Sequence, residues 1–256
     1  MTLEAVDAIE AGLRGLATAQ RAVQEKRYLK SSLVHWGTAV PDVRKVVKAE
    51  YHARTPVREE LLTLVSRLWA SDVYERRLAA VELLSAGQGL LTADDLALIE
   101  FLIREGAMWS LAGDIAGRVV SRCPQAAAAL DRWCADRDFW IRRAALLALL
   151  YGVRSRTPDL DRFTAYADAM LDEKEFFIRK AIGWVAREIS KSDPAFVVAW
   201  AEPRIARMSG ITYREVVRRL PEADAARLAL RLPTASSAPA RANPPAAPLR
   251  AARRAR

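Results

Sequence analysis

The sequence predicts an all-α protein, a right-handed solenoid of antiparallel helix pairs. Strand signals are nearly absent, because few segments alternate apolar and polar residues with a period of two. Most segments instead repeat apolar residues at helical spacing, between breaks that leave helices of about 10 to 18 residues. Three of the helical segments also resemble one another, which indicates an internal repeat.

Turn residues divide the chain at residues 38–42, 55–56, 87–89, 124, 156–158, 193–194 and 221–222. Two places carry signals for the start of a helix. Thr92 is followed by two acids and an apolar run, and Ser192-Asp-Pro likewise precedes an apolar run. We therefore expect roughly a dozen helices joined by short turns.

The similar segments are VYERRLAAVELL, FWIRRAALLALL and FFIRKAIGWVAR, which begin at residues 73, 139 and 176. Each has an aromatic residue near its start and then a basic residue, and matching positions lie 66 and 37 residues apart. If the first separation spans two units, the unit has about 33 to 37 residues, as in helix-pair solenoids. We expect a HEAT-like array over residues 1–232 and a disordered Ala-, Pro- and Arg-rich tail over residues 233–256.

The stretch KEFFIRKAIGWVARE, residues 174–188, places an indole beside cations. An apolar stripe begins at Ile178, and Lys180, Trp184 and Arg187 lie on the far side of the helix from it. Arg143 occupies the position of Lys180 in the preceding repeat, so we expect it to point the same way. Cations and aromatics repeated on one surface suit a phosphate backbone. The alternative is a solvated face with ion pairs within the repeat.

Composition favours an acidic partner. The formal charge is +9, of which five arginines of the acid-free tail contribute +5 and the remainder +4. This basic charge favours nucleic acid over a membrane surface as the partner. The sequence also shows no uninterrupted apolar run long enough to span a membrane and no secretory signal. We expect a cytoplasmic, nucleoid-associated monomer. Two cysteines and two histidines at scattered positions predict no metal site, and no nucleotide-binding fingerprint or other cofactor signal is present.

Several segments together resemble the AlkD-like DNA alkylation repair glycosylases: residues 174–188, RYLK and GTAVPDVR between Arg27 and Arg44, RLWASDVYERRLAAVELL, and DFWIRRAALLALL. The resemblance extends from about Arg27 to Leu220. It implies a HEAT-like superhelix that holds duplex DNA in a concave basic groove. It also implies excision of cationic N3- and N7-alkylated purines while the base stays in the duplex.

The resemblance implies particular site residues. It implies a tryptophan pair at Trp109 and Trp184, a basic residue at Arg143, and backbone contacts from Tyr28 and Lys30. These residue types fit the chemistry. Indole faces attract cationic groups, arginine binds phosphate, and a carboxylate can stabilise the oxocarbenium-like sugar left by the departing base.

One expected group is missing. The resemblance implies a carboxylate one helical turn after Trp109, where this chain has Gly113. Asp114 follows, but an ideal helix turns it about 140° from Trp109. Either the helix is loosened at Gly113 and Asp114 supplies the catalytic carboxylate, or the acid is lost and the protein is a weak, altered or non-catalytic relative. Without a catalytic role, Asp114 is expected to be a surface acid paired with Arg118. The missing side chain would also leave space for adducts bulkier than methylated bases.

Three functions are therefore compatible with the sequence. The first is a DNA glycosylase with Asp114, Trp109 and Trp184 at its catalytic site and duplex DNA as its partner. The second is a non-catalytic HEAT-like protein that binds branched or distorted DNA. The third is a helical-repeat scaffold for other proteins, which requires only the solenoid.

Overall fold

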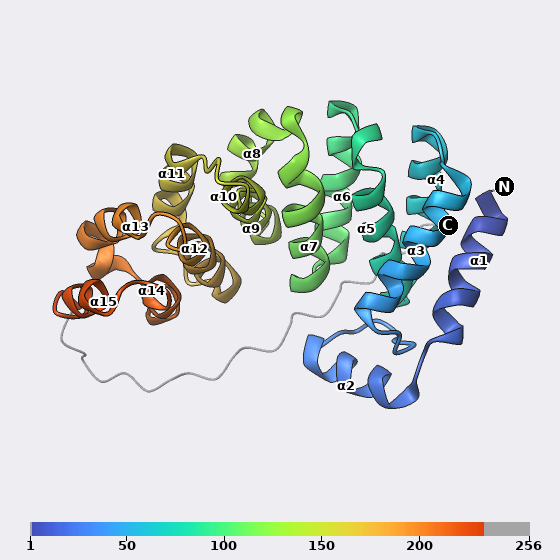
Figure 1. The fold of residues 1–256 in the computed structure, drawn as a ribbon, viewed down its shortest axis with the longest axis horizontal. Coiled ribbons are helices and arrows are strands. Elements are labelled where there is room, and N and C mark those ends of the chain that lie inside the picture. Colours follow the sequence, from blue (N-terminus) through green and yellow to red (C-terminus); the bar gives the residue numbers. More distant parts are fainter. Residues whose placement is uncertain (1, 233–256) are drawn as a thin grey trace, which may run out of the picture.

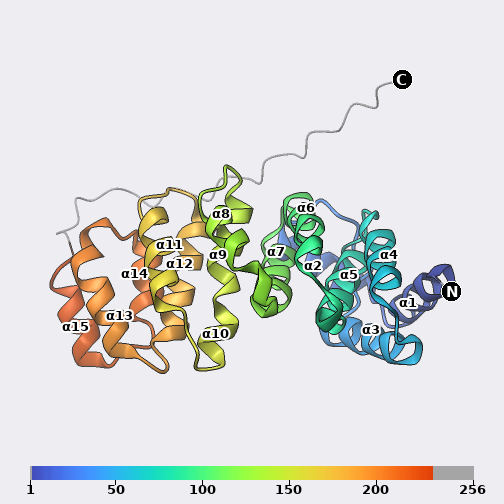
Figure 2. The ribbon, with the colours of Figure 1, turned by 90° about the horizontal axis from the view of Figure 1, so that it is seen from above.

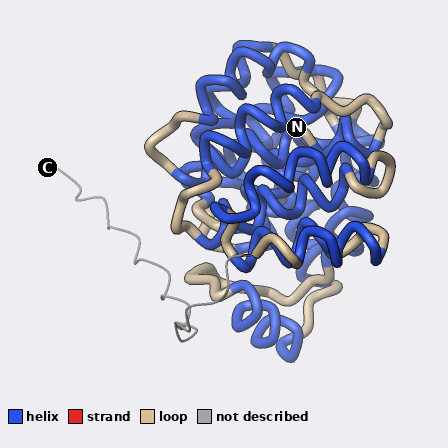
Figure 3. Tube along the Cα trace, turned by 90° about the vertical axis from the view of Figure 1, so that its left-hand side faces the viewer, coloured by secondary structure: helices blue, strands red, loops and turns tan. Residues whose placement is uncertain are grey.

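The computed structural model describes residues 2–232, which form an arc of stacked helices (Figure 1). Seen from above, the helix pairs from α4 onward follow one another in chain order along the arc (Figure 2). Within the described range, residues 34 and 73 form an isolated parallel bridge, and no strand is present (Figure 3). The all-α prediction is thus confirmed, whereas the tail predicted for residues 233–256 lies outside the described residues. None of the described helices is long and apolar enough to cross a membrane.

Short turns and 3-10 segments separate the α-helices. The helices of the first half are α1 (Thr2–Gly15), α2 (Ala19–Leu29), α3 (Val40–Arg54), α4 (Arg58–Trp69), α5 (Tyr74–Ala86), α6 (Leu96–Gly106) and α7 (Trp109–Asp114). A π-helical turn, η3 (Ile115–Val119), continues α7. The remaining helices are α8 (Ala127–Cys134), α9 (Phe139–Ala148), α10 (Leu150–Arg154), α11 (Leu160–Met170), α12 (Phe176–Ile189), α13 (Pro194–Ala201), α14 (Gly210–Val217) and α15 (Glu222–Ala229).

The predicted helix starts are confirmed by hydrogen bonds. Thr92 and Asp95 form a reciprocal capping box before α6, in which the Asp95 carboxylate accepts from the Thr92 backbone N–H at 2.8 Å. Asp193 caps α13 by accepting a 2.9 Å hydrogen bond from the backbone N–H of Phe196. Both side chains occupy donors that a helix start would otherwise leave unpaired.

The three similar segments correspond to α5, α9 and α12, each the second helix of an antiparallel pair. Helix α7 closes the intervening pair α6–α7, which explains why the first separation is close to twice the repeat length. The α7 segment lacks the aromatic–basic start of the other three, so the sequence pattern skips it. The repeat unit inferred from the sequence therefore corresponds to one helix pair of the array.

Helices α12 and α14 pack closely. The stripe of α12 is confirmed, since Ile178, Ile182 and Val185 are fully buried. A Cβ atom at Gly183 would lie 2.5 Å from the Cβ of Glu215, so only glycine permits this approach of α14. This contact places an acid of α14 beside the charged side of α12.

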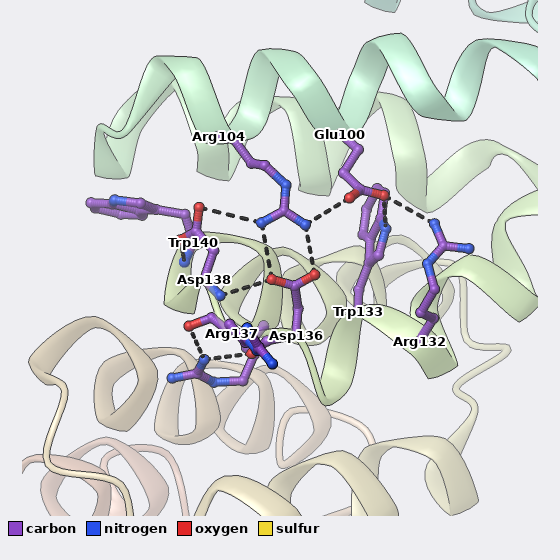
Figure 4. Close-up of polar contacts among 9 residues, drawn as sticks. Glu100, Arg104, Arg132, Trp133, Asp136, Arg137, Asp138 and Trp140 are labelled. Atoms are coloured by element: carbon purple, nitrogen blue, oxygen red, sulfur yellow. Dashed lines mark hydrogen bonds and ion pairs between the residues drawn. The ribbon is translucent and has the colours of Figure 1, made fainter. Parts of the chain in front are cut away.

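Ion pairs join successive repeats. Arg104 of α6 donates hydrogen bonds to Glu100 of its own helix and to Asp136 of the next repeat, at 2.7 and 2.6 Å (Figure 4). The indole of Trp133 also donates to Glu100, at 2.7 Å. Comparable pairs link residues 31 to 38 positions apart, which is about one repeat unit: Arg44–Glu82, Arg58–Asp95, Arg142–Glu173 and Arg204–Asp168.

Candidate functional site

A pocket of about 660 Å³ is formed by α2, α3, α5, α7 with η3, α9, α10 and α12. Four aromatic side chains line it: Tyr28, Tyr74, Trp109 and Trp184. Five arginines but only two carboxylates also line it, which gives the lining an excess of positive charge, although Arg44 and Arg118 pair with Glu82 and Arg154 pairs with Glu188 behind it. A basic, aromatic-lined pocket of this size can accept a planar cationic group attached to an anionic backbone.

The two tryptophans named from the sequence meet here. Trp109 begins α7 and Trp184 lies on α12, and both indoles are half-buried while lining the pocket. Tyr28 of α2 is 72% exposed, and its ring contacts Trp109 edge-on with 5.7 Å between centroids. The structure therefore gives Tyr28 a position against an indole, rather than on a separate part of the surface.

Asp114 also lines the pocket, and two glycines explain how. Residues 109, 113 and 117 form one row of the α7–η3 segment, and residues 110, 114 and 118 form the neighbouring row. Gly113 and Gly117 carry no side chains, so the pocket extends across the first row to the second. The helix does loosen, but its π-helical turn begins at Ile115, after Asp114. The angle between Asp114 and Trp109 on the helix therefore does not keep Asp114 out of the pocket.

The Asp114 carboxylate has no hydrogen bond or ion pair within the described part of the chain. Its predicted pairing with Arg118 is wrong, because Arg118 donates two hydrogen bonds to Glu82 of α5, one of them 2.6 Å long. Arg44 also donates to Glu82, at 3.1 Å. Burial raises the pKa of Asp114, and the nearby charge of Arg118 opposes this rise. Asp114 is thus an unpaired carboxyl group facing the pocket.

Arg143 lies beneath the pocket. Its residue is only 3% exposed, so the expectation of an open cationic surface at this position is wrong. The helix around it is apolar on nearly all sides, which is why its guanidinium is buried. Its Nε and Nη1 atoms have no hydrogen-bond partner within residues 2–232, and burial lowers its pKa to about 10. A Cβ atom at Gly113 would lie 3.7 Å from Nη1, so the guanidinium faces the space that Gly113 leaves open.

The other cations named from the sequence do not line this pocket. Lys180 and Arg187 both form ion pairs with the buried Glu215 of α14. Ion pairing of these cations is what the alternative of a solvated helix face predicted, but the acid belongs to the next repeat and not to the same one. Lys30 is exposed in the left-handed conformation that ends α2, away from the pocket lining. The pocket thus unites Trp109, Trp184, Asp114, Arg143 and Tyr28, but not these three.

Sequence reasoning did not place several lining residues in the pocket, among them Glu25, Arg44 and Tyr74, and it named Arg118 only as a partner of Asp114. One signal was available for Arg118, because Ser110, Asp114 and Arg118 recur every four residues beside a row of two glycines. Arg44 is the last residue of GTAVPDVR, one of the segments on which the resemblance rests, but no role was expected for it. Glu25 and Tyr74 have no sequence pattern that connects them to the tryptophans.

The fold and the pocket define a helical-repeat protein with a basic, aromatic-lined cleft on consecutive second helices. The sequence profile of one family, described as "DNA alkylation repair enzyme", matches residues 9–220. The chain belongs to this family. None of the curated proteins compared with the chain matches it.

Solved structures share the fold. A structure described as a predicted DNA alkylation repair enzyme from Enterococcus faecalis superposes with a TM-score of 0.71 at 20% identity, covering 80% of this chain and 97% of that one. AlkD2 from Streptococcus mutans gives 0.57 at 18% identity, covering 78% and 98%. The protein smu.31 from Streptococcus mutans UA159 gives 0.56 at 17%, covering 79% and 98%.

Proposed function

We propose that this protein is a DNA glycosylase that hydrolyses the N-glycosidic bond of cationic N3- or N7-alkylated purines in duplex DNA without extruding the base. The observation that carries the proposal is the unpaired Asp114 carboxyl group in one pocket with Trp109 and Trp184. The family assignment supports a repair enzyme. The positive lining of the pocket supports DNA as the partner.

Each group has a role in this reaction. The alkylated purine carries a positive charge, which the faces of Trp109 and Trp184 attract. As the base departs, positive charge develops on the sugar, and the ionised Asp114 carboxylate stabilises it and orients the attacking water. Because Asp114 is partly buried and unpaired, its charge acts at short range with little screening.

Arg143 supplies an anion contact. Its guanidinium is buried and has two unpartnered donor atoms, so a phosphate group entering the pocket gains charge-assisted hydrogen bonds and relieves an uncompensated charge. Tyr28 holds the edge of Trp109 and extends the aromatic wall toward the pocket mouth. Lys180, Arg187 and Lys30 would act at longer range, along the DNA backbone outside the pocket.

The test is single-turnover release of 7-methylguanine and 3-methyladenine from alkylated duplex DNA. The native protein should release base, and Trp184→Ala and Asp114→Asn should each slow release at least tenfold. Asp161→Asn is the matched control, because Asp161 is exposed on α11 and does not line the pocket. Release that persists in Asp114→Asn but not in Trp184→Ala would keep the glycosylase and reject Asp114 as its carboxylate.

The second candidate is a non-catalytic binder of branched or distorted DNA. Gly113 favours it, because the carboxylate implied one turn after Trp109 is missing. This candidate predicts no base release from any alkylated duplex, together with tight DNA binding that weakens steeply with added salt. A protein scaffold would instead show weak DNA binding.

A further inference from the structure

Helix α2 forms one wall of the pocket but is weakly packed. It contributes Arg21, Gln24, Glu25 and Tyr28 to the lining, while Leu29 is its only buried residue. Figure 1 shows α2 lying apart from the stacked helix pairs. So little apolar burial gives α2 a small share of the hydrophobic stabilisation that holds the other helices.

Beside α2, the side chain of His35 is buried without hydrogen bonds. It is 1% exposed, and neither ring nitrogen has a hydrogen-bond partner among the residues that the structure describes. Its ring stacks on Tyr74 with 4.7 Å between centroids. The Glu25 side chain is 10% exposed, and its Oε2 atom also lacks a hydrogen bond and lies 3.5 Å from the Nδ1 atom of His35. Unsatisfied buried polar atoms this close together point to a missing partner.

Glu75 completes the group from α5. It is fully buried, and its Oε1 atom accepts hydrogen bonds from the backbone N–H groups of Gly37 and Thr38, at 2.5 and 3.3 Å. Its Oε2 atom accepts one from Trp36, at 3.0 Å, which leaves it a free lone pair. Backbone donors of this kind orient a carboxylate in the way that outer-shell contacts orient metal ligands.

We propose that Glu25, His35 and Glu75 bind a divalent transition-metal ion, with zinc as the best match, that fastens α2 to the helical array. One donor atom from each residue lies within 4.8 Å of the other two. An imidazole and two carboxylates suit zinc, and three protein ligands leave a position for water. Arg21 pairs with the other oxygen of Glu25 at 3.5 Å, and the ion would add positive charge between the two carboxylates, which lowers their mutual repulsion.

The geometry allows the ligands to close around an ion. Zinc–ligand bonds of about 2.0 to 2.2 Å require the three donors to draw closer together. Glu25 can make this movement because its helix has few apolar contacts. The ligands come from α2, from the segment after it and from α5, so metal binding would link the pocket wall formed by α2 to helix α5 of the array. The sequence predicted no metal site, and this proposal departs from that prediction, because the three donors lie 10 and 40 residues apart and include no cysteine.

The test is titration of the metal-free full chain with ZnCl2 by isothermal calorimetry. We expect one ion per chain, with affinity at least tenfold weaker in both Glu25→Gln and His35→Gln. His52→Gln is the matched control, because His52 is exposed on α3, and it should bind as the native protein does. Zinc should also slow tryptic cleavage after Arg21, Lys26 and Arg27 of α2, and EDTA should reverse this effect.

Two results would overturn the proposal. One is the absence of saturable zinc binding to the native chain. The other is equal binding by the native protein and Glu25→Gln, with circular dichroism showing that both are folded. In either case a His35–Glu25 ion pair or a bound water would satisfy these atoms. None of these readouts depends on DNA binding or base release, so failure of the proposed glycosylase activity would leave this test intact.

Discussion

Gly113→Asp should stabilise the protein, because it gives Arg143 the partner that it lacks. The new Cβ atom would lie 3.7 and 3.9 Å from the two Nη atoms of Arg143 and 3.7 Å from a methyl group of Leu147, all ordinary contacts. Opposite charges about 4 Å apart attract by about 4 kcal/mol at an effective dielectric constant near 20. Desolvation of the new carboxylate removes part of this energy, and hydrogen bonds to charged groups contribute about 1.5–3 kcal/mol net.

We therefore expect a gain of about 2 kcal/mol in the free energy of unfolding, or a rise in Tm of roughly 4–8 °C for a chain of this size. Differential scanning calorimetry and urea denaturation would measure it. Gly113→Asn is the control, since Asn has a similar shape and helix propensity but no charge. Equal stability of the Asp and Asn variants would refute the reasoning. Arg143 would then be compensated by other means, and its proposed phosphate contact would lose its basis.

Three further predictions follow from the same contacts. Base release should decline as pH falls through the raised pKa of Asp114, which a pH–rate profile checks. Asp114→Asn should be more stable than the native protein at neutral pH but not in acid, because the cost of burying the ionised carboxyl is absent below its ordinary pKa and is complete above its raised pKa; pH–stability profiles of both proteins check this. Glu82→Gln should lower the free energy of unfolding, measured by urea denaturation, by about 2–4 kcal/mol because Glu82 pairs with Arg118. It should also move the midpoint of the pH–rate profile to lower pH, because the charge of Glu82 raises the pKa of Asp114, and an unchanged midpoint would contradict this. Glu215→Gln should free Lys180 and Arg187 of α12 from their ion pairs, so DNA binding measured by fluorescence anisotropy should tighten and depend more steeply on salt. An unchanged salt dependence would exclude these two cations from the DNA contact.

The repeat architecture could be predicted because its signal is local. Aromatic residues, basic residues and apolar spacing within a dozen residues mark α5, α9 and α12. Helix α7 escaped the pattern because its segment, WSLAGD, has small residues where the others have large ones. Its position could be inferred only from the doubled separation between its neighbours.

The site was predicted in part. The tryptophans came from a resemblance, and the structure brings them together with Asp114 and Arg143. The pairing of Lys180 with Glu215 could not be foreseen, because the acid lies 35 residues away on another helix. Periodicity locates a residue on one helix but does not show which residue of the next repeat faces it. Pocket width likewise depends on packing between helices, which a helical wheel of α7 does not contain.

The ion pairs that join repeats also bear on how such a chain can grow. Donor and acceptor stand about one unit apart, so a tandem duplication of a whole unit copies both partners and recreates the joint at each new boundary. Loss or gain of a single helix would instead leave a buried acid such as Glu82 or Asp95 without its arginine. Changes in length are therefore tolerated in multiples of a helix pair, and the electrostatics of the joints keep an inherited array in register.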